Sequence, residues 1–258
     1  MNLSKIKAVF FDLDGTLYLG ETLFDGVKDT LSFLRNKGYK IVYLTNNSSK
    51  SNAEYVNKLK RIGIYDERDA VYSSLDATID YIENNLKELT FYPIATQCAI
   101  DCMKERGIKI SEKADAVLLA YDTEFTYDKC VIANNLLIEN ARYFATHPDE
   151  TCPNQPYFVP DTGSFINLFK TSSNRVPEMI FGKPYKTMST YLLKRLNLTR
   201  DEILMVGDRL DTDILYGVNS EFTTCLVYTG ITDEESYKKS KIKASFCLKD
   251  VNELRNLL

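Results

Sequence analysis

Short apolar runs alternate with amphipathic helical stretches at both ends of this 258-residue chain. Near the N-terminus, an apolar strand over residues 7–12 precedes a helix over 27–36 and a second strand over 40–45. A similar unit recurs late, with a helix over 185–196, a strand over 203–206, a helix from about residue 212 and a strand over 223–227. This alternation is typical of a parallel sheet covered by helices. We therefore predict an α/β protein with a doubly wound, Rossmann-like core.

The middle of the chain has an alternation of its own. It predicts strands over 91–95, 116–119 and 143–146, with a helix over 127–140. The proline-rich stretch from Pro148 to Pro160 is predicted to be a long loop, which inside a compact domain is usually functional. We therefore expect an α/β domain at 79–180, inserted between the two halves of a core domain, 1–78 and 181–258.

Composition and charge limit the partners. With 44% hydrophobic and 26% charged residues the chain is predicted to be globular, and its net charge of -4 offers no basic surface for nucleic acid or a membrane. A small molecule is the expected partner. No apolar run reaches the roughly 18 residues that span a bilayer, and residues 1–5 show no signal-peptide pattern, so we expect a cytoplasmic protein.

The cysteines give no sign of a disulfide framework or a zinc site. All six are dispersed in apolar surroundings, which favours reduced thiols. Cys98 and Cys102 have helical i, i+4 spacing, but zinc needs further cysteine or histidine ligands, and the chain has one histidine.

Two carboxylates follow the first apolar run. Side chains alternate along a strand, so Asp12 and Asp14 should point the same way while Leu13 turns into the core. Two carboxylates in one site require a cation or a bound proton, so the pair indicates a metal site, an acid/base role, or both. The alternative for this segment alone is a strand that ends in an ordinary Asp-Gly turn.

Three further polar clusters lie at expected strand ends or helix starts. Thr45 and Asn46 close the second strand, where hydroxyl and N–H groups can bind an anion, although a helix N-cap has the same pattern. Lys183 offers a charge for a phosphate, although a lone lysine is more often a solvated surface residue. Asp208, Asp211 and Asp213 follow the late strand. Active sites of such sheets lie at the carboxyl ends of the strands, where Asp12, Thr45 and Asp208 all stand.

In this order, the four clusters resemble the motifs of the haloacid dehalogenase-like phosphohydrolases. The insertion resembles the large C2-type α/β cap of subclass IIA, the NagD-like and para-nitrophenylphosphatase-like enzymes. Residues 126–129, 145–149 and 163–164 also match that group, so the resemblance covers nearly the whole chain. It implies a magnesium-dependent phosphatase for small phosphomonoesters, such as sugar phosphates, phosphoglycolate, pyridoxal phosphate or nucleotide monophosphates.

The resemblance implies the chemical roles of three residues. Asp12 would be the nucleophile that forms an aspartyl-phosphate. Asp14 would protonate the leaving group and then, as a carboxylate, deprotonate the water that hydrolyses the intermediate. Mg²⁺ would be held by the carboxylate of Asp12, the backbone carbonyl of Asp14, and Asp208.

The remaining core residues would bind phosphate or support the metal. Thr45, the N–H of Asn46 and Lys183 would hold the phosphoryl oxygens. Asp213 would orient a water molecule on the metal. Asp211 could instead begin the next helix, where an acid is favoured by the helix dipole.

The inserted domain departs from the family pattern at two residues. His147 stands where related enzymes often have asparagine, which favours a substrate contact or a loop hydrogen bond over a general base. Asp161 stands where the family commonly has glycine. With Asp149, these are the expected specificity residues of the cap. Related proteins often pair through the cap, which suggests a homodimer.

Two alternatives to hydrolysis remain open. The same fold could pass the phosphoryl group to another hydroxyl, as a phosphotransferase. It could also bind a phosphorylated ligand as a non-catalytic regulatory protein, although the intact motifs argue against this.

Overall fold

The computed structural model describes residues 3–154 and 157–258, which form two compact units. The core unit contains the chain up to Thr45, Ala53–Tyr72 and Lys183–Leu258, and the cap unit contains Asn46–Asn52 and Ser73–Gly182. The limits expected from the sequence, 78/79 and 180/181, lie close to two of these borders.

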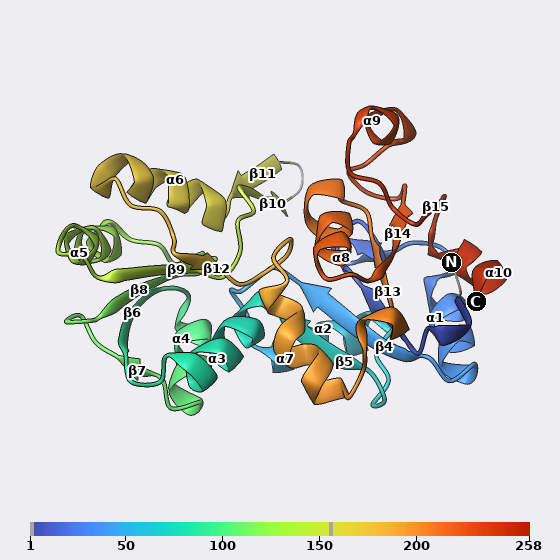
Figure 1. The fold of residues 1–258 in the computed structure, drawn as a ribbon, viewed down its shortest axis with the longest axis horizontal. Helices are drawn as coiled ribbons and strands as arrows, with labels where there is room; N and C mark the ends of the chain where they lie inside the picture. The colour runs from blue at the N-terminus through green and yellow to red at the C-terminus, as the bar shows by residue number, and fades with distance from the viewer. Residues whose placement is uncertain (1–2, 155–156) are drawn as a thin grey trace. The chain divides into compact units, whose positions relative to one another are not determined.

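A sheet with the strand order β15-β14-β13-β1-β4-β5 forms the centre of the core unit (Figure 1). Strand β1 (Ala8–Phe11) pairs in parallel with β13 (Ile203–Gly207) on one side and β4 (Lys40–Thr45) on the other. Every residue of β1 and β13 is buried, as expected for parallel strands covered on both faces. The outer strands are β5 (Ala70–Ser73), β14 (Thr223–Val227) and β15 (Phe246–Leu248).

Helices cover both faces of the core sheet. Val9 and Phe11 belong to an apolar cluster with residues of α1 (Val27–Asn36), α2 (Asn52–Ile62) and α10 (Leu254–Leu257). Phe10 faces the other way and meets Phe222, which in turn packs against Tyr216 of α8. The other elements of this unit are the hairpin β2 (Tyr18–Leu19) and β3 (Thr22–Leu23), α7 (Thr187–Leu196), a π-helical segment Leu210–Ile214, α8 (Leu215–Asn219), α9 (Glu234–Lys239), and the 3-10 turns Leu3–Lys5, Arg200–Glu202 and Val251–Glu253.

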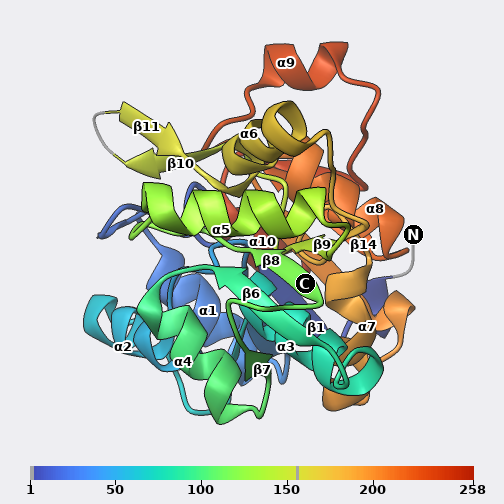
Figure 2. The same cartoon turned by 90° about the vertical axis from the view of Figure 1, so that its left-hand side faces the viewer.

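The cap unit has its own parallel sheet, in the order β12-β9-β8-β6-β7. In strand β8, Ala116 and Leu118 pack with helices on one face, and Val117 and Leu119 pack with helices on the other. Figures 1 and 2 show α3 and α4 on the first face and α5 and α6 on the second. The bounds are α3 (Ser74–Asn85), β6 (Thr90–Ile94), α4 (Gln97–Glu105), β7 (Lys109–Ile110), β8 (Ala116–Leu119), α5 (Tyr127–Ile138), β9 (Arg142–Ala145), α6 (Thr162–Ser173) and β12 (Met179–Ile180).

The proline-rich stretch is not the long loop that the sequence predicts. It contains an antiparallel pair, β10 (Thr151–Asn154) and β11 (Tyr157–Pro160), in which Thr151 is opposite Pro160 and Cys152 is opposite Val159. Proline is tolerated in such a ribbon because an edge strand has positions where no ladder N–H is needed. The β-forming residues between the prolines therefore outweighed the proline signal.

The predicted fold class is confirmed, with a parallel core sheet and a second parallel sheet in the inserted unit. The predicted helix over 27–36 and strand over 40–45 coincide with α1 and β4. Across residues 3–154 and 157–258, no helix combines the length and apolar character that crossing a bilayer requires.

Candidate active site

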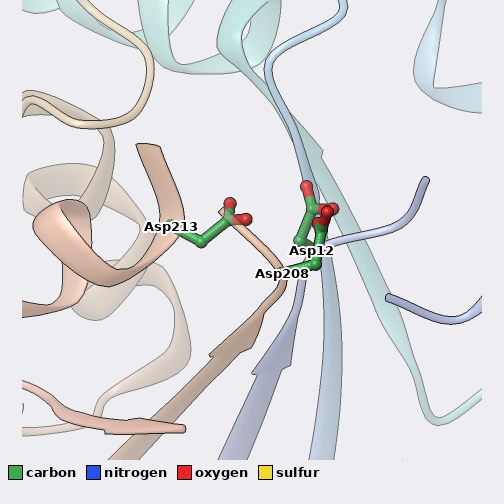
Figure 3. A group of neighbouring side chains, drawn as sticks. All are labelled: Asp12, Asp208 and Asp213. Carbon is green, nitrogen blue, oxygen red and sulfur yellow. The ribbon is translucent and has the colours of Figure 1, made fainter. Parts of the chain in front are cut away.

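Three aspartates from different parts of the core unit meet at the carboxyl edge of its sheet. Asp12 follows β1, Asp208 follows β13, and Asp213 lies in the π-helical segment after β13. Each offers a carboxylate oxygen, and these oxygens lie within 4.8 Å of one another (Figure 3). In the core sheet, β4 and β13 lie on opposite sides of β1, so the strand order reverses at β1. In α/β sheets, ligands bind at the carboxyl ends of the strands at such a topological switch point.

Lys183 links two of the three carboxylates. Its ammonium donates to Asp12 Oδ1 at 2.5 Å and to Asp213 Oδ1 at 2.7 Å. The lysine is only 2% exposed, so it is not the solvated surface residue that its sequence context allowed. Burial lowers the pKa of Lys183, but Asp12 and Asp213 outweigh it and raise that pKa above its ordinary value. Lys183 is therefore a fixed positive charge beside Asp12.

Backbone and hydroxyl groups hold the other carboxylate, that of Asp208. Ile231 N–H donates to Asp208 Oδ2 at 2.8 Å, and the hydroxyl of Thr16 lies 3.3 Å from Asp208 Oδ1 and 3.4 Å from Asp12 Oδ2. A Cβ on Gly15 would lie 2.6 Å from Asp208 Oδ2, and one on Gly230 would lie 2.0 Å from the same atom. Glycine is required at both positions because the backbone approaches this carboxylate so closely.

Ionising all three aspartates at once is energetically unfavourable. Burial raises the pKa of Asp12 to about 6 against the opposing charge of Lys183. Burial and Asp213 raise the pKa of Asp208 to about 6, and burial and Asp12 do the same for Asp213. One lysine cannot balance three carboxylates, so the site is suited to an additional cation. The donor set consists of oxygen atoms, which is what hard divalent ions prefer.

Asp14 lies beside this cluster and is more accessible. Its side chain is 46% exposed, whereas Leu13 is buried, as the alternation along the strand predicted. Gly20 N–H donates to Asp14 Oδ1 at 3.3 Å, and Lys58 lies 3.9 Å from Asp14 Oδ2. Asp14 is more exposed than Asp12, at 46% against 14%, so it has the access that a proton donor to an incoming molecule needs.

The two residues expected to bind phosphate from the second strand are buried. Thr45 ends β4 and is 8% exposed, so it lies at the same edge of the core sheet as Asp12. Asn46 belongs to the cap unit by its contacts, where its side-chain amide donates to Asp149 Oδ2 at 3.0 Å. Its backbone carbonyl accepts from the hydroxyl of Ser74.

Asp211 is separate from the carboxylate cluster. Its side chain is 72% exposed and lies 3.6 Å from the guanidinium of Arg209. It stands in the first turn of the π-helical segment Leu210–Ile214, where the helix dipole favours an acid.

The expected cap residues form a buried cluster inside the cap unit. His147 is fully buried, and its Nε2 is 2.9 Å from the hydroxyl of Thr162. Asp149 and Asp161 lie on opposite sides of the imidazole, at 3.6 Å from Nδ1 and 3.5 Å from Nε2. Asp161 also caps α6 by accepting from Thr162 N–H at 2.6 Å. These contacts are loop and helix-cap interactions, and the specificity role stays a prediction.

Sequence reasoning missed several groups of the site. Thr16 is not among the site residues expected from the sequence, although its hydroxyl lies within 3.4 Å of two of the aspartates. Gly230 and Ile231 approach Asp208 from the loop after β14, and Lys58 approaches Asp14 from α2. Only Thr16 carried a signal, because it lies within the same motif as Asp12 and Asp14.

Comparisons with known proteins identify the family. Residues 9–109 match a model described as haloacid dehalogenase-like hydrolase, and residues 180–254 match a related hydrolase model of the same superfamily. The acid sugar phosphatase of Staphylococcus haemolyticus is 32% identical over 252 residues, which are 97% of this chain and 95% of that protein. The chain belongs to the haloacid dehalogenase-like hydrolases.

Solved structures place it more narrowly within these hydrolases. The 4-nitrophenylphosphatase of Thermotoga maritima has a TM-score of 0.94 with 33% identity and 98% of each chain covered. A structure described as a putative NagD protein has a TM-score of 0.94 with 31% identity over the whole of both chains. This hydrolase is therefore a phosphatase of the NagD-like, p-nitrophenylphosphatase-like subclass IIA, as the motifs predicted.

Proposed function

We propose that this phosphatase hydrolyses small phosphomonoesters through an aspartyl-phosphate on Asp12, with Mg²⁺ as its metal. The observation that carries the proposal is the group of three close carboxylates, of Asp12 and of the buried Asp208 and Asp213, with Lys183 hydrogen bonded to two of them. Such a site at the carboxyl edge of a parallel sheet can bind a cation and a phosphate together.

The donor atoms fit Mg²⁺. Asp12, Asp208 and the backbone carbonyl of Asp14 would hold the ion, and Asp213 would support it while bonded to Lys183. When bound, Mg²⁺ would offset the carboxylate charges and the charge of the transferring phosphoryl group.

The chain's own residues account for the proton and phosphoryl transfers. A carboxylate oxygen of Asp12 forms a bond to phosphorus as the bond to the leaving oxygen breaks, and Asp14 gives that oxygen its proton. Asp14, now a carboxylate, takes a proton from water, whose oxygen attacks phosphorus and breaks the bond to Asp12. The net reaction converts an ester and water into an alcohol and phosphate.

The phosphate would be bound by one cationic and two neutral hydrogen-bond donors. Lys183 would contact a phosphoryl oxygen while it also offsets repulsion between Asp12 and the dianion. The hydroxyl of Thr45 and the N–H of Asn46 would donate to the other oxygens. Full burial of the lysine supports this role, because a buried ammonium has a larger electrostatic effect than a solvated one.

The substrate class is small phosphorylated metabolites, with sugar phosphates first. Relatives named acid sugar phosphatase at 32% identity support this order. Phosphoglycolate, pyridoxal phosphate and nucleotide monophosphates are the other members of the proposed class. In the cap, His147, Asp149 and Asp161 would set the ranking by shaping residues 147–153 and 157–163 rather than by exposure of their own side chains.

Phosphate release from a panel of these esters, with and without Mg²⁺, tests the proposal. The wild type should release phosphate only with the metal, and Asp12→Asn should release none. Asp211→Asn is the matched control, because Asp211 lies three residues from Asp208, is 72% exposed and lies outside the group of three carboxylates, so this variant should keep its activity. Equal activity of wild type and Asp12→Asn would contradict the nucleophile assignment.

The same panel separates hydrolysis from the two alternatives. A phosphotransferase would form a new ester when an acceptor alcohol is added, at the expense of free phosphate. A non-catalytic binding protein would turn over no ester and yet bind one in calorimetry.

A homodimer through the cap stays part of the proposal. Exposed apolar residues on α5 support it, since Tyr127, Val131 and Ile138 are 79%, 38% and 57% exposed. Light scattering on the wild type should give twice the chain mass, and Ile138→Glu should shift it toward the monomer.

A further inference from the structure

Lys58 of α2 lies next to the proposed acid. Its Nζ is 3.9 Å from Asp14 Oδ2 and 4.0 Å from the centre of the Tyr18 ring. The lysine side chain is 20% exposed, although it stands on a surface helix. An ammonium held over a ring and beside a carboxylate has two favourable electrostatic partners in one place.

Tyr18 lies next to both Lys58 and Asp14. Tyr18 is 1% exposed, and its backbone forms an isolated β-bridge with Asp14. A buried ring has a fixed position, and the ammonium of Lys58 lies over its face, 4.0 Å from the ring centre. The backbone supports this arrangement, because Gly15 N–H donates to the carbonyl of Tyr18 at 2.8 Å.

Each oxygen of Asp14 therefore has a defined neighbour. Gly20 N–H contacts Oδ1 at 3.3 Å, and Lys58 lies on the side of Oδ2. A half-exposed aspartate without such neighbours would exchange between side-chain rotamers. A general acid must instead be held within hydrogen-bond reach of the leaving oxygen, since a small misplacement costs much of its effect.

The ordinary alternative is a lysine that packs its alkyl chain on a tyrosine and contributes only to stability. Lys60 on the same helix is such a residue. It lies 5.2 Å from the ring centre of Tyr65, pairs with the exposed Glu67, and is 49% exposed. Lys58 differs from it in being more buried and in facing a residue of the reaction.

We propose that Lys58 is a positioning residue which, together with Tyr18, holds the carboxyl group of Asp14 in the orientation for proton transfer to the leaving group. This inference rests on the proposed function, because it concerns the proton donor of that reaction.

The leaving group distinguishes positioning of an acid from a structural role. An alkoxide leaves slowly without a proton, whereas nitrophenolate leaves well without one. The value of kcat/KM reports the steps up to the transfer of the phosphoryl group, so it is independent of the later hydrolysis of the intermediate. Loss of Asp14 positioning should therefore lower kcat/KM for alkyl phosphates and spare it for p-nitrophenyl phosphate.

The experiment compares Lys58→Met, Lys58→Arg and Lys60→Met, using the best alkyl phosphate of the panel and p-nitrophenyl phosphate. For Lys58→Met we expect kcat/KM to fall about tenfold or more with the alkyl ester and less than about threefold with the nitrophenyl ester. A general acid contributes roughly 10²–10⁴-fold to the rate, and misorientation of Asp14 should lose part of that contribution. Lys58→Arg, which keeps the charge, should recover part of the loss, and Lys60→Met should match the wild type with both esters.

Other outcomes would overturn the inference. Equal losses of kcat/KM with both esters would indicate that Lys58 is a structural or substrate-binding residue. Unchanged kcat/KM with both esters would show that Lys58 does not contribute to the reaction. Activity with the nitrophenyl ester also shows that each variant is folded. A wild type that turns over no ester would instead overturn the proposed function and this inference with it. The ester panel with the wild type therefore distinguishes failure of the proposed function from failure of the Lys58 inference alone.

Discussion

The ammonium group of Lys183 lies 2.5 Å from Oδ1 of Asp12, although 171 residues separate the two in the chain. The same ammonium contacts Asp213, and the side chains of Lys183, Asp213 and Asp12 are 2%, 1% and 14% exposed. A nucleophilic carboxylate in such a place needs a permanent positive charge, because the dianionic group of a phosphate ester would otherwise be repelled.

Stability should depend on pH and Mg²⁺ together. The pKa of Asp12, Asp208 and Asp213 is raised from 3.8 to about 6 in the folded, metal-free protein. Between these values the folded state binds more protons than the unfolded state, so this cluster contributes less stability as pH rises from about 4 through about 6. Mg²⁺ should reverse the loss. The rise in melting temperature caused by excess Mg²⁺ should therefore be larger at about pH 7.5 than at about pH 5.

Scanning calorimetry measures this difference directly. At each pH, the melting temperature with excess Mg²⁺ is compared with that of a metal-free sample at the same pH. A metal-dependent rise that is larger at the acidic pH would contradict the charge balance described for the cluster.

Gly15→Ala should impair the metal site through Asp208. The new Cβ would lie 2.6 Å from Asp208 Oδ2 and would push that carboxylate away. Activity at limiting Mg²⁺ should fall about tenfold or more, because Asp208 is a proposed ligand, and disturbing even the groups that orient metal ligands weakens metal binding by roughly 10–100-fold. Gly38→Ala is the matched control, since its φ of +89° is close to the +91° of Gly15 and nothing lies within 4 Å of its Cβ. Titration of activity with Mg²⁺ checks both variants, and similar losses in the two would attribute the effect to backbone strain alone.

Asp69→Asn should destabilise the core unit. Asp69 accepts from the guanidinium of Arg35 at 3.0 and 2.6 Å and from the hydroxyl of Tyr43 at 3.2 Å, and its side chain is 1% exposed. Removing one charge of a buried pair leaves the other unpaired, so the free energy of unfolding should fall by about 3 kcal/mol. Urea unfolding measures the change. The exposed pair of Lys5 and Asp201 gives the control, and Asp201→Asn should leave the urea midpoint unchanged.

Replacing His147 by asparagine or Asp161 by glycine should alter the ranking of substrates more than the rate with p-nitrophenyl phosphate. Both residues hold the start of α6 and the preceding segment, and glycine in place of an N-cap aspartate costs only a few tenths of a kcal/mol, so the fold should persist. Kinetics on the ester panel measure the ranking. A ranking identical to that of the wild type in both variants would exclude the segment from substrate selection.

Much of the core site could be predicted because its chemistry follows buried strands directly. The apolar runs before Asp12 and Asp208 identify parallel strands, and the carboxyl ends of neighbouring parallel strands necessarily lie at one edge. The match of helix 27–36 and strand 40–45 with α1 and β4 has the same origin, since both carry a clear periodicity.

Contacts made by loops and helix surfaces could not be predicted in this way. The approach of Gly230 and Ile231 to Asp208 depends on how the loop after β14 folds back, which no local pattern encodes. Lys58 looks like any lysine of an amphipathic helix until the rotation of α2 is known. The sequence does not predict the antiparallel pair of β10 and β11, because the prolines in this stretch favour a loop over a strand.

Trapping of the phosphorylated enzyme tests the central claim most directly. Asp14→Asn removes the proposed base, so p-nitrophenyl phosphate should still phosphorylate Asp12 while hydrolysis of the intermediate stalls. After an acid quench, mass spectrometry should find about one phosphoryl group per chain, on the peptide that contains Asp12, and none in Asp12→Asn with Asp14→Asn. Release of nitrophenol with no phosphoryl group on that peptide would contradict an aspartyl-phosphate mechanism at Asp12.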